Sequence, residues 1–167
     1  KHGMSEKVFE SVDEKPTNSL LYSLAVGAYG MDGGSPYWGE TVLPINDKVY
    51  QIQAGLIEEL AEKGSCVIVG RCADFILKNK VKTLNVFINA SFEKRQECAI
   101  EKHNISEDEV EARLKKYDKK RADYYNSNTN KKWGDISSYD MCLDSGRLGY
   151  EMCAEIIADT VKLSREK

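Results

Sequence analysis

The sequence predicts an α/β fold with a parallel sheet, because three short apolar segments are separated by helical stretches. These segments are Cys66–Val69, Leu84–Ile88 and Tyr139–Leu143. The first is an uninterrupted apolar run with two β-branched valines, which is typical of a strand buried on both faces. Strands that alternate with helices along a chain indicate a parallel sheet. Three strands would make a thin sheet for a chain of 167 residues.

Apolar periodicity and capping residues predict the helices around these strands. A long helix opens at Asn46 and runs to Lys63, with Gly64 as its stop. The capping box Ser106–Glu109 starts a polar helix that extends to Tyr125. The other expected elements are a short helix from Ser5 to Asp13, an apolar helix from Thr17 or Asn18, an irregular connection over Gly30–Pro44, a short helix up to Leu77, a charged helix from Ser91 to about His103, a polar loop over Asn126–Ser138 and a closing helix over Leu148–Leu163.

The composition is that of an ordinary globular protein and excludes several function classes. Hydrophobic residues make up 41% and charged residues 31%, and the net charge of -3 gives no basic field for nucleic acid. No apolar run reaches the length of a membrane span. Two histidines leave little for a zinc site or a histidine-based triad, so we expect no protein-held metal. Five cysteines without a CxxC pair, three of them (Cys66, Cys142, Cys153) in apolar surroundings, predict reduced, buried thiols and a cytoplasmic location.

Small and charged residues gather where the predicted strands end. Gly70 and Arg71 directly follow the first strand. Arg95 lies one turn into the helix after the second strand, and Asp144 and Ser145 follow the third. Ligands of open α/β sheets bind beyond the carboxyl ends of the strands, where an arginine can hold a phosphate through two hydrogen bonds. Each residue also fits a plain role, such as a helix cap for Asp144. Together they predict a site for a small anionic ligand.

A second candidate region is the helical segment Leu114–Tyr125, LKKYDKKRADYY, which is dense in cations. These cations occupy different faces of a helix, so they cannot all point at one ligand. One interpretation is a solvated charged helix. The other is a mobile lid that brings cations over a transferring phosphoryl group. The cations are Lys115, Lys116, Lys119, Lys120 and Arg121.

The spaced set CVIVGR, CADFIL, LNVFINASFEKR, DKKRADYY, WGD and YDMCLDSGRLGYEMCAEII resembles the cytidylate kinase-like family. That family is a branch of the nucleoside monophosphate kinases, and the resemblance runs from about Met4 to the closing helix. It implies a three-layer P-loop kinase fold whose first strands are missing from the given chain. It also implies one domain over 1–167, with a core of 65–90 and 139–167, an acceptor-binding helical region over 5–63 and a lid region over 106–138.

The resemblance implies ATP-dependent phosphoryl transfer, with Mg²⁺, to a nucleoside monophosphate such as CMP or dCMP. Phosphoryl transfer needs positioning and charge neutralisation above all, so basic groups at a strand edge suit it. The residues that the resemblance assigns are Gly70 and Arg71 for the acceptor phosphate, Lys120 and Arg121 for the transferring phosphoryl group, Asp144 and Ser145 for the acceptor nucleoside, and Arg95 and Lys119 for support of the lid.

The chain departs from the family pattern at two places. Cytidylate kinases carry Gly-Arg-Asp, but the third position here is Cys72, and Asp74 is the candidate for that carboxylate in acceptor binding. No GxxxxGK[ST] phosphate loop occurs, and Gly27–Gly34 has neither the lysine nor a preceding strand. The chain also begins without an initiator methionine. We therefore expect a longer natural chain that carries the first strand, the phosphate loop and the first helix upstream of Lys1.

Three functions stay open on the sequence alone. The first is a cytoplasmic kinase whose partners are small-molecule nucleotides, without nucleic acid or membrane. The second is a catalytically inactive nucleotide-binding regulatory module, which Cys72 and the missing loop favour. The third, nucleic-acid binding through Lys115–Arg121, would require strong salt dependence. A homodimer is among the open oligomeric states. Gln53 could read a base or be solvated, and four aromatic residues could line an acceptor pocket, form a dimer contact or pack internally: Tyr22, Tyr29, Tyr37 and Trp38.

Overall fold

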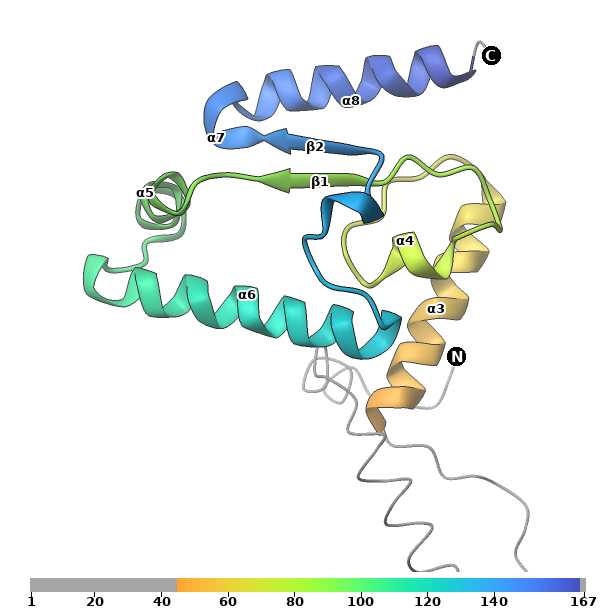
Figure 1. Cartoon of the computed structure of the whole chain (residues 1–167), viewed down its shortest axis with the longest axis horizontal. Coiled ribbons are helices and arrows are strands. Elements are labelled where there is room, and N and C mark those ends of the chain that lie inside the picture. Colours follow the sequence, from red (N-terminus) through yellow and green to blue (C-terminus); the bar gives the residue numbers. More distant parts are fainter. Residues whose placement is uncertain (1–44, 166–167) are drawn as a thin grey trace, which may run out of the picture. The chain divides into compact units, whose positions relative to one another are not determined.

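A computed structural model describes residues 45–165 (Figure 1). The expected helices near Ser5 and Thr17, the connection Gly30–Pro44 and the aromatic residues from Tyr22 to Trp38 lie outside the described residues. The described chain divides into two compact units, 45–81 with Asp123–Asn130, and 82–122 with 131–165.

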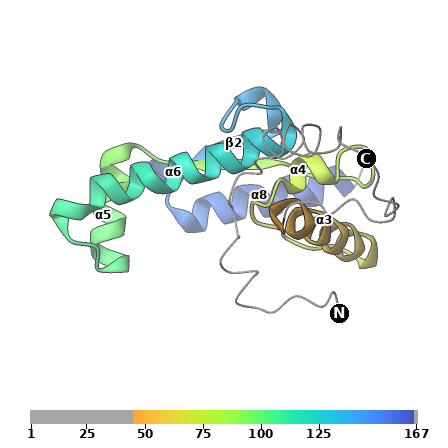
Figure 2. The same cartoon turned by 90° about the horizontal axis from the view of Figure 1, so that it is seen from below.

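The first unit is built on helix α3, Ile45–Lys63, which confirms the long helix expected from Asn46. The short helix α4, Ala73–Ile76, also matches its prediction, and it contacts α3 (Figure 2). Val49 and Ile57 on α3 are buried, whereas Leu56 and Leu60 of the same apolar stripe are exposed. Among the described residues, fewer side chains of α3 are therefore buried than the helical periodicity predicts.

The predicted strand at Cys66–Val69 is wrong. The segment forms neither strand nor helix, and Val67 and Val69 are 93% and 86% exposed. An extended segment becomes a strand only when a neighbour pairs with its N–H and C=O groups. Within 45–165 the sheet consists of two strands, neither of which comes from this segment. The apolar run indicates burial, but no described segment supplies the partner that burial requires.

The second unit contains the other two predicted strands. Strand β1, Val86–Asn89, pairs in parallel with β2, Met141–Asp144, and Figure 1 shows the two arrows pointing the same way. The register places Asn89 opposite Asp144, so both strands end at the same level. The described architecture is thus mixed α/β, mostly helical, with a small parallel sheet. The common end of the two strands is the edge where the sequence predicts a ligand.

Local capping sets the ends of helix α5, Phe92–His103. Ser91 Oγ accepts a hydrogen bond from the amide of Lys94 at 3.3 Å, as expected for an N-cap. Asn104 ends the helix in the left-handed conformation, with a φ of 51°. The charged helix predicted from Ser91 is therefore confirmed at both ends.

Helix α6, Glu107–Thr129, begins directly after Ser106, as predicted, but it runs one turn beyond the expected end at Tyr125. Thr129 Oγ1 donates to the Tyr125 carbonyl at 2.7 Å, and Asn128 Nδ2 donates to the Tyr124 carbonyl at 2.8 Å. These polar side chains bond back to the helix, so the loop predicted from Asn126 starts later.

The rest of the second unit is a short 3-10 helix and two closing helices. The 3-10 helix η1, Ile136–Ser138, lies within the predicted polar loop. The closing helix predicted over Leu148–Leu163 corresponds to α8, Tyr150–Arg165, and a short helix that the sequence did not predict, α7, Ser145–Leu148, precedes it. Gly149 separates the two helices with a φ of 79°, a conformation that glycine adopts without strain.

The five cysteines are free thiols, but only some are buried. Cys72 and Cys153 are buried, whereas Cys66 and Cys142 are exposed, so the expectation of burial is wrong for these two. Cys142 precedes buried Leu143 on β2, and neighbouring residues of a strand point to opposite faces. A residue within an apolar run is therefore not always buried. Among residues 45–165, no helix is both long and apolar enough to cross a membrane.

We expect Val110→Ala to lower the free energy of unfolding by about 2 kcal/mol, because it removes two buried methyl groups and leaves a cavity. Val110 is only 2% exposed. Val67→Ala is the matched control, with an expected change below about 0.5 kcal/mol. Urea denaturation of both variants measures the difference. Equal losses at the two positions would contradict the exposed position of Val67.

Thiol labelling provides a second test. Burial, followed by the Asp74 carboxylate, raises the pKa of the Cys72 thiol from 9.0 to about 12. Iodoacetamide at about pH 8 should therefore label Cys66 and Cys142 quickly and spare Cys72, since the thiolate is the reactive form. Peptide mass spectrometry measures the labelling rates of the three thiols, and rapid labelling of Cys72 would contradict its burial.

The raised pKa of Cys72 also makes the stability of the fold depend on pH. Between pH 9.0 and about 12 the Cys72 thiol stays protonated in the folded chain but ionises in the unfolded chain. Its stabilising contribution is therefore complete below pH 9 and falls as the pH rises toward 12.

Candidate functional site

The predicted site residues fall into two groups, one in each structural unit. The unit of 45–81 with Asp123–Asn130 contains Gly70, Arg71 and Asp74. The other unit contains the remaining six. These are Arg95, Lys119, Lys120, Arg121, Asp144 and Ser145.

The turn Gly70–Cys72 has three successive residues with positive φ. The angles are 69° at Gly70, 57° at Arg71 and 56° at Cys72. The left-handed conformation costs a non-glycine residue about 1 to 2 kcal/mol, so two such residues in sequence need support from their surroundings. The turn closes with a hydrogen bond from the Ala73 amide to the Gly70 carbonyl at 3.1 Å. Cys72 is buried and Arg71 Nη1 is buried as well, so the turn has a defined, partly enclosed conformation.

Asp74 lies in the first turn of α4 and accepts a hydrogen bond from Tyr125 of α6. Tyr125 Oη donates to Asp74 Oδ2 at 2.7 Å. Tyr50 also lies near this carboxylate, and burial, then Cys72 and then Asp74, raises the pKa of its phenol to about 12. Asp74 thus belongs to a half-buried cluster of protein groups, and the candidate carboxylate has a partner within the chain.

Tyr124, the neighbour of Tyr125 on α6, makes a similar hydrogen bond to a different helix. Tyr124 Oη donates to Gln53 Oε1 on α3 at 3.1 Å, and its ring packs edge to face against Tyr50 with centroids 6.5 Å apart. Gln53 is therefore bonded and half-buried rather than solvated. Sequence reasoning missed Tyr124 and Tyr125. The signal that could have found them is a pair of adjacent aromatic residues at the end of a polar helix.

In the other unit, Asp118 joins two of the predicted cations. Arg95 Nη1 and Nη2 donate to the two carboxylate oxygens of Asp118 at 2.8 and 2.7 Å, a bidentate pair. Arg121 Nη1 lies 3.7 Å from the same carboxylate. Lys119 is exposed and Lys120 is half-buried. This arrangement fixes the orientation of Arg95 against α6.

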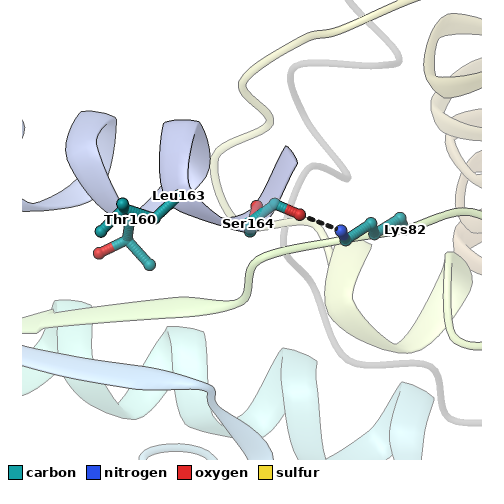
Figure 3. A pocket seen from close by; sticks show the side chains of 4 residues that line it. All are labelled: Lys82, Thr160, Leu163 and Ser164. Atoms are coloured by element: carbon teal, nitrogen blue, oxygen red, sulfur yellow. Dashed lines mark hydrogen bonds between the residues drawn. The ribbon is translucent and has the colours of Figure 1, made fainter. Parts of the chain in front are cut away.

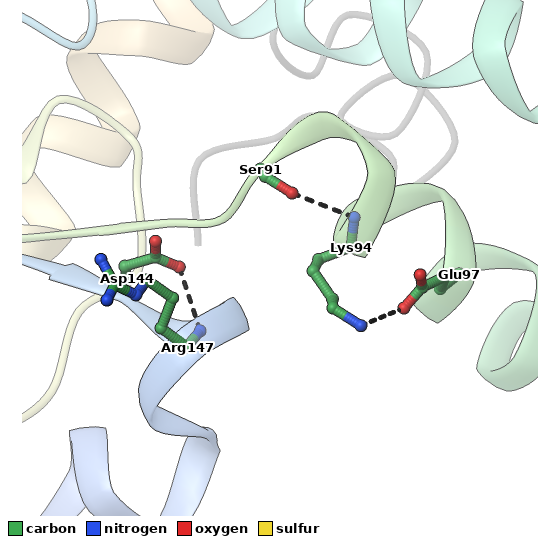
Figure 4. Close-up of polar contacts among 5 residues, drawn as sticks. All are labelled: Ser91, Lys94, Glu97, Asp144 and Arg147. Atoms are coloured by element: carbon green, nitrogen blue, oxygen red, sulfur yellow. Dashed lines mark hydrogen bonds and ion pairs between the residues drawn. The ribbon is translucent and has the colours of Figure 1, made fainter.

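The ends of β1 and β2 bring Asp144 and Ser145 next to Asn89. Ser145 Oγ donates to the Asn89 carbonyl at 3.0 Å. Asp144 caps α7, because its Oδ1 accepts the amides of Gly146 at 2.9 Å and Arg147 at 3.2 Å, the second of which Figure 4 shows. A Cβ at Gly146 would lie 3.2 Å from the Cβ atoms of two residues that follow β1, Ala90 and Lys94. The turn after β2 thus passes close to the start of α5, and Asp144 has the plain capping role.

A hollow of about 350 Å³ lies at the end of α8, lined by Lys82, Thr160, Leu163 and Ser164 (Figure 3). Lys82 Nζ donates to the Ser164 carbonyl at its edge. No predicted site residue lines this hollow. Within the described part of the chain, no three His, Cys, Asp or Glu side chains are grouped so that they could hold a metal ion.

The Arg95–Asp118 pair should contribute measurably to stability. Both side chains are less than a third exposed, at 29% and 28%. A double-mutant cycle with Arg95→Lys and Asp118→Asn should give a coupling energy of about 1 kcal/mol, since the bidentate contact is lost. The exposed pair Lys115–Glu111 is the control, with an expected coupling of about 0.3 to 0.5 kcal/mol. Equal coupling energies would show that the bidentate geometry adds nothing.

Comparison with known proteins gives a family. The profile of the cytidylate kinase-like family matches residues 1–147. A crystal structure of an uncharacterized protein from Eubacterium ventriosum ATCC 27560 is similar in fold, with a TM-score of 0.66 and 29% identity over 70% of this chain and 74% of that chain. No curated protein matches the chain. The family match spans most of the chain and includes both groups of candidate residues. The protein therefore belongs to the cytidylate kinase-like family, and this membership indicates a kinase without identifying its substrate.

Proposed function

We propose that the protein transfers a phosphoryl group from ATP to a nucleoside monophosphate, with CMP or dCMP as the first candidates. In this proposal Arg71 holds the acceptor phosphate, and Gly70 lets the backbone approach it closely. Lys120 and Arg121 neutralise charge on the transferring phosphoryl group, and Arg95 and Lys119 support the helix that carries them. Asp144 and Ser145 approach the acceptor nucleoside.

The observation that carries the proposal is the conformation of the turn around Arg71. Two non-glycine residues in the left-handed region cost free energy, and such backbone strain concentrates at functional sites. The strained residue is an arginine, whose planar guanidinium matches the oxygens of a phosphate. The family match supplies the reaction class, and the turn supplies a reason to place the acceptor phosphate at Arg71.

Two of the other charged candidates, Asp144 and Arg121, also interact with groups of the protein. Asp144 uses Oδ1 for its two capping bonds, and a carboxylate has further lone pairs that can accept a nucleoside hydroxyl or amino group. Arg121 lies at the edge of the Asp118 carboxylate at 3.7 Å, a loose contact on an exposed side chain. A phosphoryl group could displace such a contact at little cost, because exposed ion pairs contribute little.

Mg²⁺ would enter with the nucleotide in this proposal. The described residues hold no cluster of metal-binding side chains, and Mg²⁺ commonly binds through substrate phosphates together with water. When bound, the ion would neutralise charge on the phosphates. This chain's own residues would then orient the acceptor and donate hydrogen bonds to its oxygens.

A catalytically inactive nucleotide-binding module is the second candidate function. One observation favours it, namely the buried thiol of Cys72 at the position where cytidylate kinases carry a carboxylate. Burial raises the pKa of this thiol to about 12, so it supplies neither charge nor a strong hydrogen bond to a nucleotide. Binding of CMP without turnover by the full-length protein would support this candidate against the kinase.

Substitution of Arg71 tests the proposed function. Arg71→Ala in the full-length protein should raise the KM for CMP about 100-fold, because two charge-assisted hydrogen bonds to the phosphate are lost. Arg71→Lys should recover only part of this loss, since an ammonium cannot form the bidentate contact. Coupled ADP release measures both variants.

Arg113→Ala is the matched control, because Arg113 forms an exposed ion pair with Glu109 on α6. Its KM for CMP should stay within about twofold of the wild-type value. A folded wild-type protein that releases no ADP with CMP, dCMP or UMP would contradict the enzymatic proposal. An unchanged KM in Arg71→Ala would remove Arg71 from the acceptor site.

A further inference from the structure

We infer that Tyr125 and Asp74 form a positioning pair that holds the turn Gly70–Cys72 in the conformation that presents Arg71 to a phosphate. The inference rests on the proposed role of Arg71 and adds two residues to it. Neither residue would touch the acceptor. Both would act through the backbone of the turn.

The first support is the hydrogen bond itself. Tyr125 Oη lies 2.7 Å from Asp74 Oδ2, and Tyr125 is only 5% exposed. A bond between a hydroxyl and a carboxylate is stronger than one between neutral groups, and a partly dry setting strengthens it further. Asp74 lies three positions after Arg71, so this bond attaches α4 and the preceding turn to the last part of α6.

The second support is the backbone strain of the turn. Arg71 and Cys72 both lie in the left-handed region, and Cys72 stands at the N-cap of α4 without a side-chain capping bond. Such a conformation persists only where the surroundings impose it. Burial of Cys72 holds one side of the turn, and the Tyr125–Asp74 bond holds the helix that follows. Loss of the bond should let the turn relax toward less strained angles and move the Arg71 side chain.

The third support is the setting of the Asp74 carboxylate. Burial above all, and the negative charge of Asp74 in addition, raises the pKa values of Tyr50 and Cys72, because the carboxylate lies near both groups. A carboxylate that approached the acceptor phosphate would also repel it, since like charges oppose each other in a partly dry site. A positioning role removes this difficulty, because the hydrogen bond from Tyr125 holds the carboxylate within the protein.

Tyr124 provides a matched control within the same helix. It is adjacent to Tyr125 and similarly buried, at 7% exposed. Its hydroxyl, however, bonds to Gln53 on α3 rather than to α4. Tyr124→Phe and Tyr125→Phe therefore remove one hydroxyl each: the first removes the bond to Gln53 on α3, and the second removes the bond to Asp74 on α4, the helix that follows Arg71.

The test compares Tyr125→Phe, Asp74→Ala, Asp74→Asn and Tyr124→Phe in the full-length protein by two readouts. The first is the rate at which phenylglyoxal modifies Arg71, followed by peptide mass spectrometry without nucleotide. The reaction should be slow in the wild type, because Arg71 is half-buried and one of its two terminal guanidinium nitrogens, Nη1, is fully buried. The second readout is the separate measurement of KM and kcat for CMP.

We expect Tyr125→Phe and Asp74→Ala to speed Arg71 modification about fivefold or more, and to raise the KM for CMP about tenfold with kcat within about twofold. Asp74→Asn keeps an acceptor oxygen and should fall between these variants and the wild type. Tyr124→Phe should leave both readouts within about twofold of the wild type. If Tyr125→Phe fails to fold, Asp74→Ala carries the same expectation.

Unchanged Arg71 modification in Tyr125→Phe and Asp74→Ala overturns the inference, whether or not CMP is a substrate. Equal effects of Tyr124→Phe and Tyr125→Phe also overturn it, since any lost hydroxyl would then suffice. Faster modification confined to the Tyr125 and Asp74 variants, in a protein that uses no nucleoside monophosphate, supports the positioning pair and contradicts the proposed function.

Discussion

The left-handed conformation of Arg71 and Cys72 is the constraint on which the proposed acceptor site depends. Two non-glycine residues with φ near 57° do not hold this shape alone, so the surrounding contacts must impose it. Burial of Cys72 and the hydrogen bond between Tyr125 and Asp74 are contacts of this kind. Cys72, which stands where cytidylate kinases carry the aspartate of Gly-Arg-Asp, thus has a structural role. It packs against the protein where a carboxylate would carry charge.

Local signals in the sequence were sufficient to predict much of the fold. Ser91 predicted the start of α5 and the helix ends near His103 as expected, because a capping hydroxyl is a property of a single residue. The parallel orientation of β1 and β2 was also predicted, since apolar segments separated by helices favour a parallel sheet, but which strands would be neighbours was not. The exposed segment at Cys66–Val69 shows the limit of such reasoning. An apolar run indicates a tendency to be buried, and burial depends on which other segment is there to cover it.

The candidate site was predictable only in part. Arg71 and Asp74 were proposed as site residues because they follow an apolar run, and Asp144 because it follows another. Their hydrogen-bond partners could not be found in this way. The contact of Asp74 with Tyr125 joins residues that are 51 positions apart, and no local pattern encodes such a contact. It changes the interpretation of Asp74 from a group that binds the acceptor to one that positions Arg71.

The most direct test of the central claim is the NMR signal of the Arg71 Nε–H group during titration of the full-length protein. CMP should shift this signal, whereas cytidine, which lacks the phosphate, should leave it in place. Inorganic phosphate should shift it in the same direction as CMP, since a guanidinium recognises phosphate oxygens through hydrogen bonds. Equal shifts with CMP and cytidine, or no shift with any of the three, would contradict the assignment of Arg71 to the acceptor phosphate.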